Sequence, residues 1–178
     1  GIIRVLHSLS FVDDPTRMLR AVRFEQRFGF QLDNRTLQLM DEAKDLLKQL
    51  SGDRIRHELD LILMEQAPQA ILTRAQQLSL LASIHPALRW DDCNTAPLTK
   101  ILHDEIPSLW RLSPETNGIP TKRLLTYLVW LGQIPLETLM EISVRMRFSR
   151  ALREALQKIS QLLPDLPALI SQKPSQVV

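Results

Sequence analysis

An all-α fold is predicted by three features of the sequence. The 178 residues include only five glycines and one tyrosine. No run of alternating β-branched residues occurs, although that pattern marks a half-buried strand. Apolar residues instead recur at helical spacing, between the Asp, Gly and Pro residues that commonly start and end helices. We therefore expect a multi-helix N-terminal part followed by a second helical part.

The first predicted helix has a defined start and end. Asp14 supplies a carboxylate for the N-cap, and Pro15 follows at the first helical position, where its missing N–H is tolerated. Gly29 suits the left-handed conformation that ends many helices. These residues predict a helix from about Pro15 to Phe28.

Two further helices are expected before residue 66. Asp33 or Asn34 caps the second, which reaches Leu50, and the third covers about 53–65 after the break at Ser51-Gly52. Each has an apolar side that can face a core. These core positions are Leu37, Met40, Leu47, Leu50, Ile55, Leu59, Ile62 and Leu63.

The remainder of the chain is predicted to form shorter helices, because prolines recur and separate or kink them. We expect them near 68–80, 86–90, 97–112, 121–132, 135–146, 149–163 and 165–172. The stretch from Trp90 to Pro97 is rich in Asp, Asn and Thr, which is typical of a connection. We therefore place a domain boundary here, between residues 1–90 and 91–178.

The composition is that of a folded protein, with 44% hydrophobic and 24% charged residues. No apolar run approaches the ~20 residues of a membrane span. The single cysteine, Cys93, cannot form an internal disulfide, which fits a reducing compartment and a cytoplasmic protein. A net charge of +2 is too small to indicate nucleic-acid binding by itself.

Arg17 is the first candidate functional residue. At 100° per residue it shares a helix face with Ala21, Phe24 and Phe28, while three other residues form a second apolar side. A helix with two apolar sides is mostly enclosed, so we expect Arg17 to be shielded from solvent and to need a partner. Asp14, three residues earlier, is within reach.

Residues 13–17 (D-D-P-T-R), continuing M-L-R-A-V-R-F to residue 24, resemble the E-D-x-x-R segment of class II CCA-adding enzymes and bacterial poly(A) polymerases. Residues 51–59 (S-G-D-R-I-R-H-E-L) resemble the next motif of that family, E-R-I-x-x-E-L, with aspartate in place of the first glutamate. Residues 1–4 (G-I-I-R) resemble its G-x-I-R segment. The detailed match covers residues 1 to about 65.

The resemblance implies an RNA nucleotidyltransferase that adds CCA, A or poly(A) to RNA 3′ ends, with tRNA as the substrate. Residues 1–90 would be the nucleotide-selecting and RNA-binding neck, and 91–178 a helical body. Residues 174–178 look like the start of a further helix, so we expect this body to be truncated at its C-terminus. Asp14 and Arg17, with Asp13 and Arg20, would bind ATP or CTP. Arg54 and Glu58 would be structural residues that brace the first helix.

Catalysis in this superfamily needs carboxylates that hold Mg²⁺, usually in an Asp-x-Asp motif. No Asp-x-Asp occurs in the chain. We therefore expect that this chain contains no catalytic residue and is inactive alone. The Mg²⁺ would be bound by an N-terminal catalytic head of the same protein.

The chemistry of the Asp14–Arg17 pair suits base selection. A carboxylate can accept a hydrogen bond from the amino group of cytosine or adenine, and a guanidinium can donate to the neighbouring ring nitrogen. Uracil and guanine present a carbonyl and an N–H in those places. They would leave buried groups unpaired, which is costly.

Two further groups of basic residues are candidates for RNA contact. Alternatively, each group could form a solvated face, and the group on the first helix could instead face the catalytic head. The two groups comprise Arg20, Arg23 and Arg27 on the first helix, and Arg145, Arg147, Arg150, Arg153 and Lys158 near the C-terminus.

Two different functions stay open. His103-Asp104, with His85 and Asp165, could belong to a metal-dependent phosphohydrolase of the HD kind, although nearby prolines disturb the helices that would present the ligands. Alternatively, the chain could be a helical interaction scaffold without a substrate.

Overall fold

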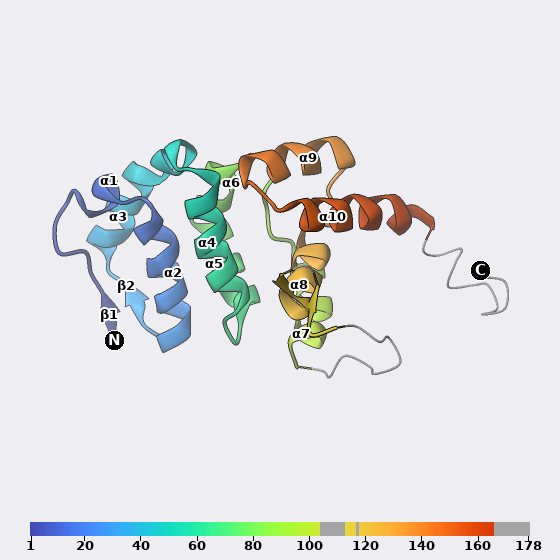
Figure 1. The fold of residues 1–178 in the computed structure, drawn as a ribbon. Helices are drawn as coiled ribbons and strands as arrows, with labels where there is room; N and C mark the ends of the chain where they lie inside the picture. The colour runs from blue at the N-terminus through green and yellow to red at the C-terminus, as the bar shows by residue number, and fades with distance from the viewer. Residues whose placement is uncertain (104–112, 117, 166–178) are drawn as a thin grey trace.

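The computed structural model of the chain describes residues 1–103, 113–116 and 118–165 and shows an assembly of short helices (Figure 1). The α-helices are α1 (Ser10–Asp13), α2 (Thr16–Phe28), α3 (Asn34–Ala43), α4 (Gly52–Leu63), α5 (Pro68–Gln77), α6 (Leu80–Ile84), α7 (Thr95–His103), α8 (Thr121–Leu131), α9 (Leu136–Arg145) and α10 (Arg150–Leu162). Short 3₁₀-helices are η1 (Lys44–Gln49), η2 (Asp92–Asn94) and η4 (Leu163–Asp165). The predicted all-α class is confirmed.

Two short strand pairs are additions to the predicted helices. β1 (Ile2–Ile3) pairs in parallel with β2 (Gln31–Leu32), so the segment before α1 lies beside the segment that follows α2. β3 (Glu115–Thr116) and β4 (Ile119–Pro120) form an antiparallel pair before α8. Two-residue strands are too short to produce an alternating pattern, which is why the sequence does not reveal them.

The N-terminal helices follow their local signals closely. α2 begins at Thr16, one residue later than predicted, and ends at Phe28, directly before Gly29, which is left-handed with φ 62°. Asp33 caps α3, because its side chain accepts a hydrogen bond of 2.7 Å from the backbone N–H of Thr36. The predicted second helix tightens into η1 after Ala43 instead of continuing as an α-helix to Leu50.

The helix predicted at 86–90 is wrong, and the one predicted at 68–80 is divided. α5 ends at Gln77, Ser79 is left-handed with φ 59°, and α6 then begins at Leu80. α6 packs against η1 and buries Leu80 and Leu81. Burial against a distant segment thus decides where this helix lies. The helices predicted at 97–112 and 165–172 fall partly or largely outside the described residues.

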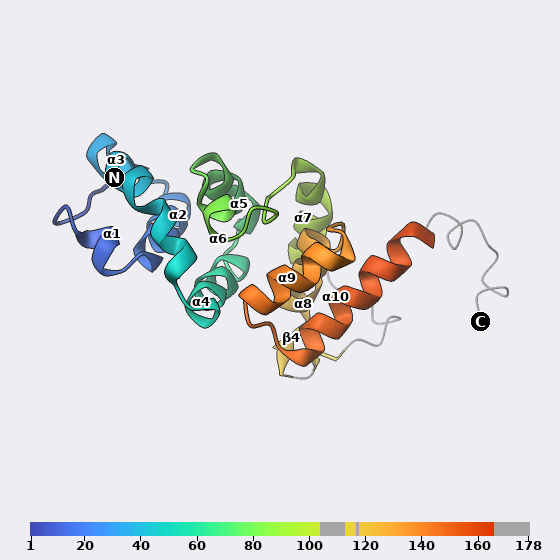
Figure 2. The ribbon, with the colours of Figure 1, turned by 90° about the horizontal axis from the view of Figure 1, so that it is seen from above.

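The apolar core continues from the N-terminal helices into the C-terminal ones. Figures 1 and 2 show α4 between α2 and the C-terminal helices. All four predicted core residues of α4 are buried. α4 contacts α8, and α5 contacts α7. The guanidinium of Arg145 at the end of α9 donates to the carbonyl oxygens of Leu47, Lys48 and Leu50, at 2.9–3.1 Å. The division after Trp90 stays a prediction.

In the part of the chain that the structure describes, no helix combines the length and apolar character that crossing a membrane requires.

The end of α2 offers a test of backbone conformation. Gly29→Ala is expected to lower the free energy of unfolding by about 1 kcal/mol, since an L-residue is strained at φ 62° although the space beside its Cα is empty. Urea denaturation measures this change. Gly29→Asn is the matched control and should cost less, because asparagine tolerates the left-handed region. An alanine variant as stable as the wild type would contradict the assignment.

Candidate functional site

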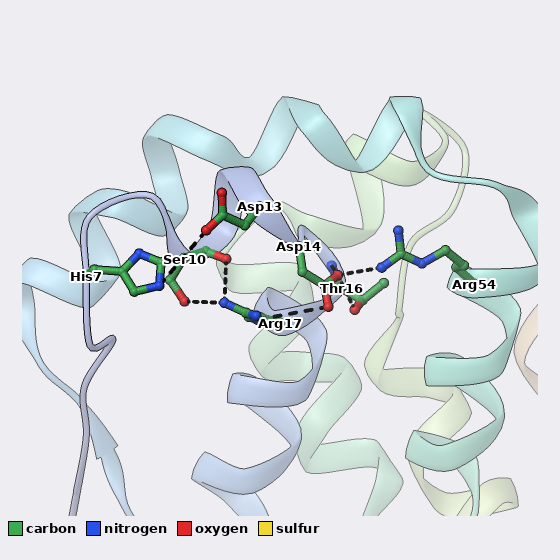
Figure 3. Close-up of polar contacts among 7 residues, drawn as sticks. All are labelled: His7, Ser10, Asp13, Asp14, Thr16, Arg17 and Arg54. Atoms are coloured by element: carbon green, nitrogen blue, oxygen red, sulfur yellow. Dashed lines mark hydrogen bonds and ion pairs between the residues drawn. The ribbon is translucent and has the colours of Figure 1, made fainter.

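Asp14 lies at the junction of α1, α2 and α4 (Figure 3). Its Oδ1 accepts hydrogen bonds from the backbone N–H of Thr16 at 3.1 Å and from the Thr16 hydroxyl at 2.6 Å. The same oxygen accepts a third bond, of 2.7 Å, from Arg54 Nη2. Oδ2 lies 3.9 Å from Arg17 Nε. One carboxylate oxygen therefore holds the local structure together, and the other faces Arg17.

The surroundings of Asp14 favour its charged form. Partial burial raises the pKa of the carboxyl, but the two hydrogen bonds from Thr16 and the charges of Arg54 and Arg17 together outweigh it. The pKa of Asp14 is consequently lowered from its usual value of 3.8. The carboxylate is an acceptor throughout the physiological pH range.

This lowered pKa predicts how Asp14 contributes to stability. The contribution should be fully present above pH 3.8, and it should be lost as the pH falls from there through the lower pKa of the folded state. The free energy of unfolding of the wild type minus that of Asp14→Asn, measured by denaturant titration, should thus be constant from neutral pH down to that value and then shrink. A difference that already declines well above pH 3.8 would contradict the assignment.

Arg17 is less enclosed than its helical face predicts. Its side chain is 42% exposed, so the expectation that it is shielded from solvent is wrong. The apolar stripe that it shares turns outward, since Phe28 on the same face is 54% exposed. Nη1 donates to the carbonyl oxygen and the hydroxyl of Ser10, at 3.2 Å and 3.0 Å. These bonds to α1 and the proximity of Asp14 orient the guanidinium (Figure 3).

A shallow groove of about 430 Å³ adjoins Arg17. Arg20 also lines it, together with His7 and Phe24. Asp13 is exposed at the end of α1, and its Oδ2 lies 4.0 Å from His7 Nε2. The structure thus brings Arg17 and Arg20 to one groove, with Asp14 beside Arg17 and Asp13 beside His7. Sequence reasoning missed His7 and Ser10, because both belong to a segment without a helical pattern.

Arg54 and Glu58 both contact the region of α2, but through different partners. Arg54 binds Asp14 at the start of the helix. Glu58 is buried, and its Oε2 lies 3.9 Å from Nη2 of Arg23. Both residues of α4 thus lie against the region of α2, and their role in bracing that helix stays a prediction.

Two of the arginines proposed for RNA contact are bound to one carboxylate. Arg23 is buried, with 8% of its surface exposed, and its Nη1 donates to Glu65 at 3.1 Å. Arg27 is exposed, and its Nη1 donates to the same oxygen at 3.4 Å. The burial of Arg23 leaves it no surface for a phosphate, so it serves the fold in this structure. Contact of Arg27 with RNA stays a prediction.

The C-terminal basic residues differ in their partners and in their exposure. Arg145 is bound to backbone carbonyls, and burial lowers its pKa. Arg147, which has a positive φ of 49°, pairs with Asp53, and Arg150 pairs with Glu154. Arg153 is half-buried on α10 and Lys158 is exposed. RNA contact by these residues stays a prediction.

A buried ion pair between α2 and α5 had no signal in the sequence. Glu25 is 5% exposed and accepts hydrogen bonds from Arg74 Nε at 2.8 Å and from the backbone N–H of Leu32 at 3.1 Å. Arg74 is 49 residues away, and Leu32 lies beyond the end of α2, so neither partner belongs to the same helix as Glu25. This contact fixes the position of α2 and therefore of the site at its start.

The alternative metal site lacks support among the residues that can be placed. Asp104 lies outside the described residues, as does the side chain of His103. His85 accepts a hydrogen bond from the backbone N–H of Ala87 and lies 3.8 Å from Glu141. Within the described ranges, no three His, Cys, Asp or Glu residues come together in a way that could hold a metal ion.

Chemically, the site combines an acceptor and donors at the edge of a groove. Asp14 Oδ2 and the guanidinium of Arg17 lie side by side, both held in place by other contacts. Such a pair can bind the edge of a planar group that has a donor beside an acceptor.

Known proteins resemble the chain in sequence and in structure. The family described as "Probable RNA and SrmB- binding site of polymerase A" matches residues 29–91. The A-adding tRNA nucleotidyltransferase of Geobacter sulfurreducens is 46% identical over 106 residues, which are 58% of this chain and 12% of that protein. A structure of a CCA-adding enzyme with ATP superposes with a TM-score of 0.76 at 32% identity, over 100% of this chain and 41% of the other.

The Thermotoga maritima CCA-adding enzyme complexed with tRNA superposes with a TM-score of 0.73, also at 32% identity, over 96% of this chain and 40% of the other. The chain therefore spans about an eighth of the Geobacter protein and two fifths of these solved structures. The matching part of each structure is its helical part. Over residues 29–91 the chain thus matches an RNA-binding family, and over its whole length it is similar to part of the helical region of CCA-adding enzymes.

Proposed function

We propose that the chain is the nucleotide-selecting and RNA-binding part of a template-independent nucleotidyltransferase that adds CCA, A or poly(A) to RNA 3′ ends, with tRNA as the main substrate. The observation that carries the proposal is the pair of Asp14 Oδ2 and Arg17 at the edge of the groove. The relatives' names, which include A-adding and CCA-adding enzymes, support the reaction class.

The pair would select a base by its hydrogen-bonding edge. Asp14 Oδ2 accepts from the exocyclic amino group of cytosine or adenine, and Arg17 donates to the adjacent ring nitrogen. Asp14 is suited to this because its lowered pKa keeps it ionised, while Thr16 and Arg54 occupy its other oxygen. Uracil and guanine carry a carbonyl where cytosine and adenine carry the amino group, so they would place a carbonyl oxygen against the carboxylate of Asp14. Asp13 and Arg20 stand beside this pair and would contact the rest of the nucleotide.

The chemical step would take place in an N-terminal catalytic head of the same protein. Mg²⁺ would supply charge stabilisation at the triphosphate there. ATP and CTP are the expected substrates, and solved relatives with ATP and with CTP support this assignment. We place the activity in the cytoplasm.

The reaction can be tested on a tRNA that lacks its 3′-terminal CCA or its final A. The intact protein is incubated with all four nucleoside triphosphates and Mg²⁺, and the RNA 3′ ends are sequenced. We expect C and A to be added and U and G to be excluded, and the pattern of addition distinguishes CCA, A and poly(A) synthesis. The isolated 178-residue chain is the control and should add nothing. No addition by the intact protein would instead favour a helical scaffold.

A further inference from the structure

A second groove lies at the opposite end of α2 from Asp14. It has a volume of about 550 Å³ and is formed by the C-terminal ends of α2 and α4 and the start of α5. In Figure 1 these ends lie together at the bottom of the N-terminal helices, away from α1. The Asp14–Arg17 pair and this groove lie near the two ends of α2, a 13-residue helix that is about 20 Å long.

The rim of this groove carries two large apolar side chains that are open to solvent. Phe28 is 54% exposed and Met64 is 67% exposed, and both line the groove. Phe28 also continues a row of aromatic rings, with centroids 5.8 Å from Phe24 and 5.6 Å from Phe30. The guanidinium of Arg27 lies 5.4 Å from the Phe28 ring centroid. A flat ligand could stack here on an aromatic ring, beside a thioether.

Groups that can bind the edge of such a ligand are also present. The exposed side chains of Gln26 and Gln66 line the groove, and each amide offers both donors and an acceptor. The charges are balanced, because the two arginines, Arg23 and Arg27, lie beside two carboxylates, Glu58 and Glu65. This combination fits a nucleobase better than a phosphate, since stacking and edge contacts do not need excess positive charge.

We propose that this groove binds an unpaired base of the RNA substrate, as a contact separate from the base-selecting pair of Asp14 and Arg17. The inference rests on the proposed function for the identity of the ligand. Leu61, Met64 and Gln66 lie within residues 29–91, the part of the chain matched by the family described as RNA-binding. Arg27 and Phe28 extend that surface onto α2, outside the matched range.

The test is binding of short RNA to the intact protein and to Phe28→Leu and Met64→Ala variants. Phe28→Leu removes the aromatic face but keeps an apolar side chain. The control is Val144→Ala on α9, because Val144 is as exposed as Met64 and lies outside both grooves. Fluorescence anisotropy with a labelled single-stranded oligonucleotide of C and A, and with a blunt duplex, gives the dissociation constants at two salt concentrations.

We expect Phe28→Leu to weaken single-strand binding by about five-fold or more and Met64→Ala by less, whereas binding to the duplex is unchanged. The effect should be the same at both salt concentrations, because no phosphate contact is removed. Unchanged single-strand affinity in both variants would overturn the inference. An equal loss for the duplex would also overturn it.

The two proposals fail separately. If the intact protein adds no nucleotide but its affinity for RNA decreases in Phe28→Leu, the RNA-binding role of the groove is confirmed and the proposed function is wrong. If the intact protein adds C and A, and both variants bind RNA with wild-type affinity, only the proposed role of the groove is wrong. Loss of binding to a protein partner, with RNA affinity intact, would assign the groove to that partner.

Discussion

Arg17→Ala in the intact protein is expected to reduce the preference for CTP and ATP over UTP and GTP by about ten- to a hundred-fold. The variant removes the donors that the ring nitrogen of cytosine or adenine would meet, and an unpaired buried group costs about 1–3 kcal/mol. Asp14 would keep its charge and its bonds to Thr16 and Arg54. Incorporation from mixtures of the four nucleotides, read by sequencing of the RNA 3′ ends, measures the preference.

Two further variants separate selection from charge and from stability. Arg17→Lys keeps the positive charge but loses the planar fork, so it should lose most of the preference as well. Arg35→Ala is the matched control, since Arg35 is an exposed arginine on α3 that donates to Gln38. Because Arg17 also binds Ser10, thermal unfolding of each variant must be followed. A preference that survives in a folded Arg17→Ala protein would refute the proposed role.

Glu25→Ala is expected to lower the free energy of unfolding by about 3 kcal/mol. Removal of one partner of a buried ion pair usually costs about 3–5 kcal/mol, because the other charge is left without compensation. The lower end applies here, since the Arg74 side chain is 27% exposed and can regain some solvation. The backbone N–H of Leu32 also loses its acceptor. Chemical denaturation of the wild type and the variant measures the difference.

The double variant Glu25→Ala/Arg74→Ala tests the physical cause. It should be less destabilised than the sum of the single variants, because no unpaired charge remains. Glu42→Ala, at an exposed position on α3, should change stability by less than about 0.5 kcal/mol. Additive effects of Glu25→Ala and Arg74→Ala would show that the pair does not act as a unit.

The first helices were predictable because their signals are local. Asp14, Asp33 and Gly29 act through backbone groups within four residues, so their roles can be inferred from neighbouring residue types. The division at Ser79 was missed, because no glycine or proline marks that left-handed residue. Helix α6 was misplaced for a related reason. Its burial against η1 joins segments more than 30 residues apart.

The candidate site shows the same limit. The proximity of Asp14 and Arg17 follows from their three-residue spacing on the turn that begins a helix. The exposure of Arg17 cannot be predicted from this spacing, because the apolar residues Phe24 and Phe28 on the same helix face predict that the face is buried. In the structure that face turns outward, and the other apolar side of α2 packs against α4 and α5.

Short-range patterns thus sufficed for the all-α class, the limits of α2 and the pairing of Asp14 with Arg17. The third partner of Asp14, Arg54, and the burial of Glu25 against Arg74 required the folded structure. Capping and helical spacing act over a few residues and leave a trace in the sequence. Contacts across 40 or 49 residues depend on how helices pack, and that packing is decided by the shared core rather than by any local pattern.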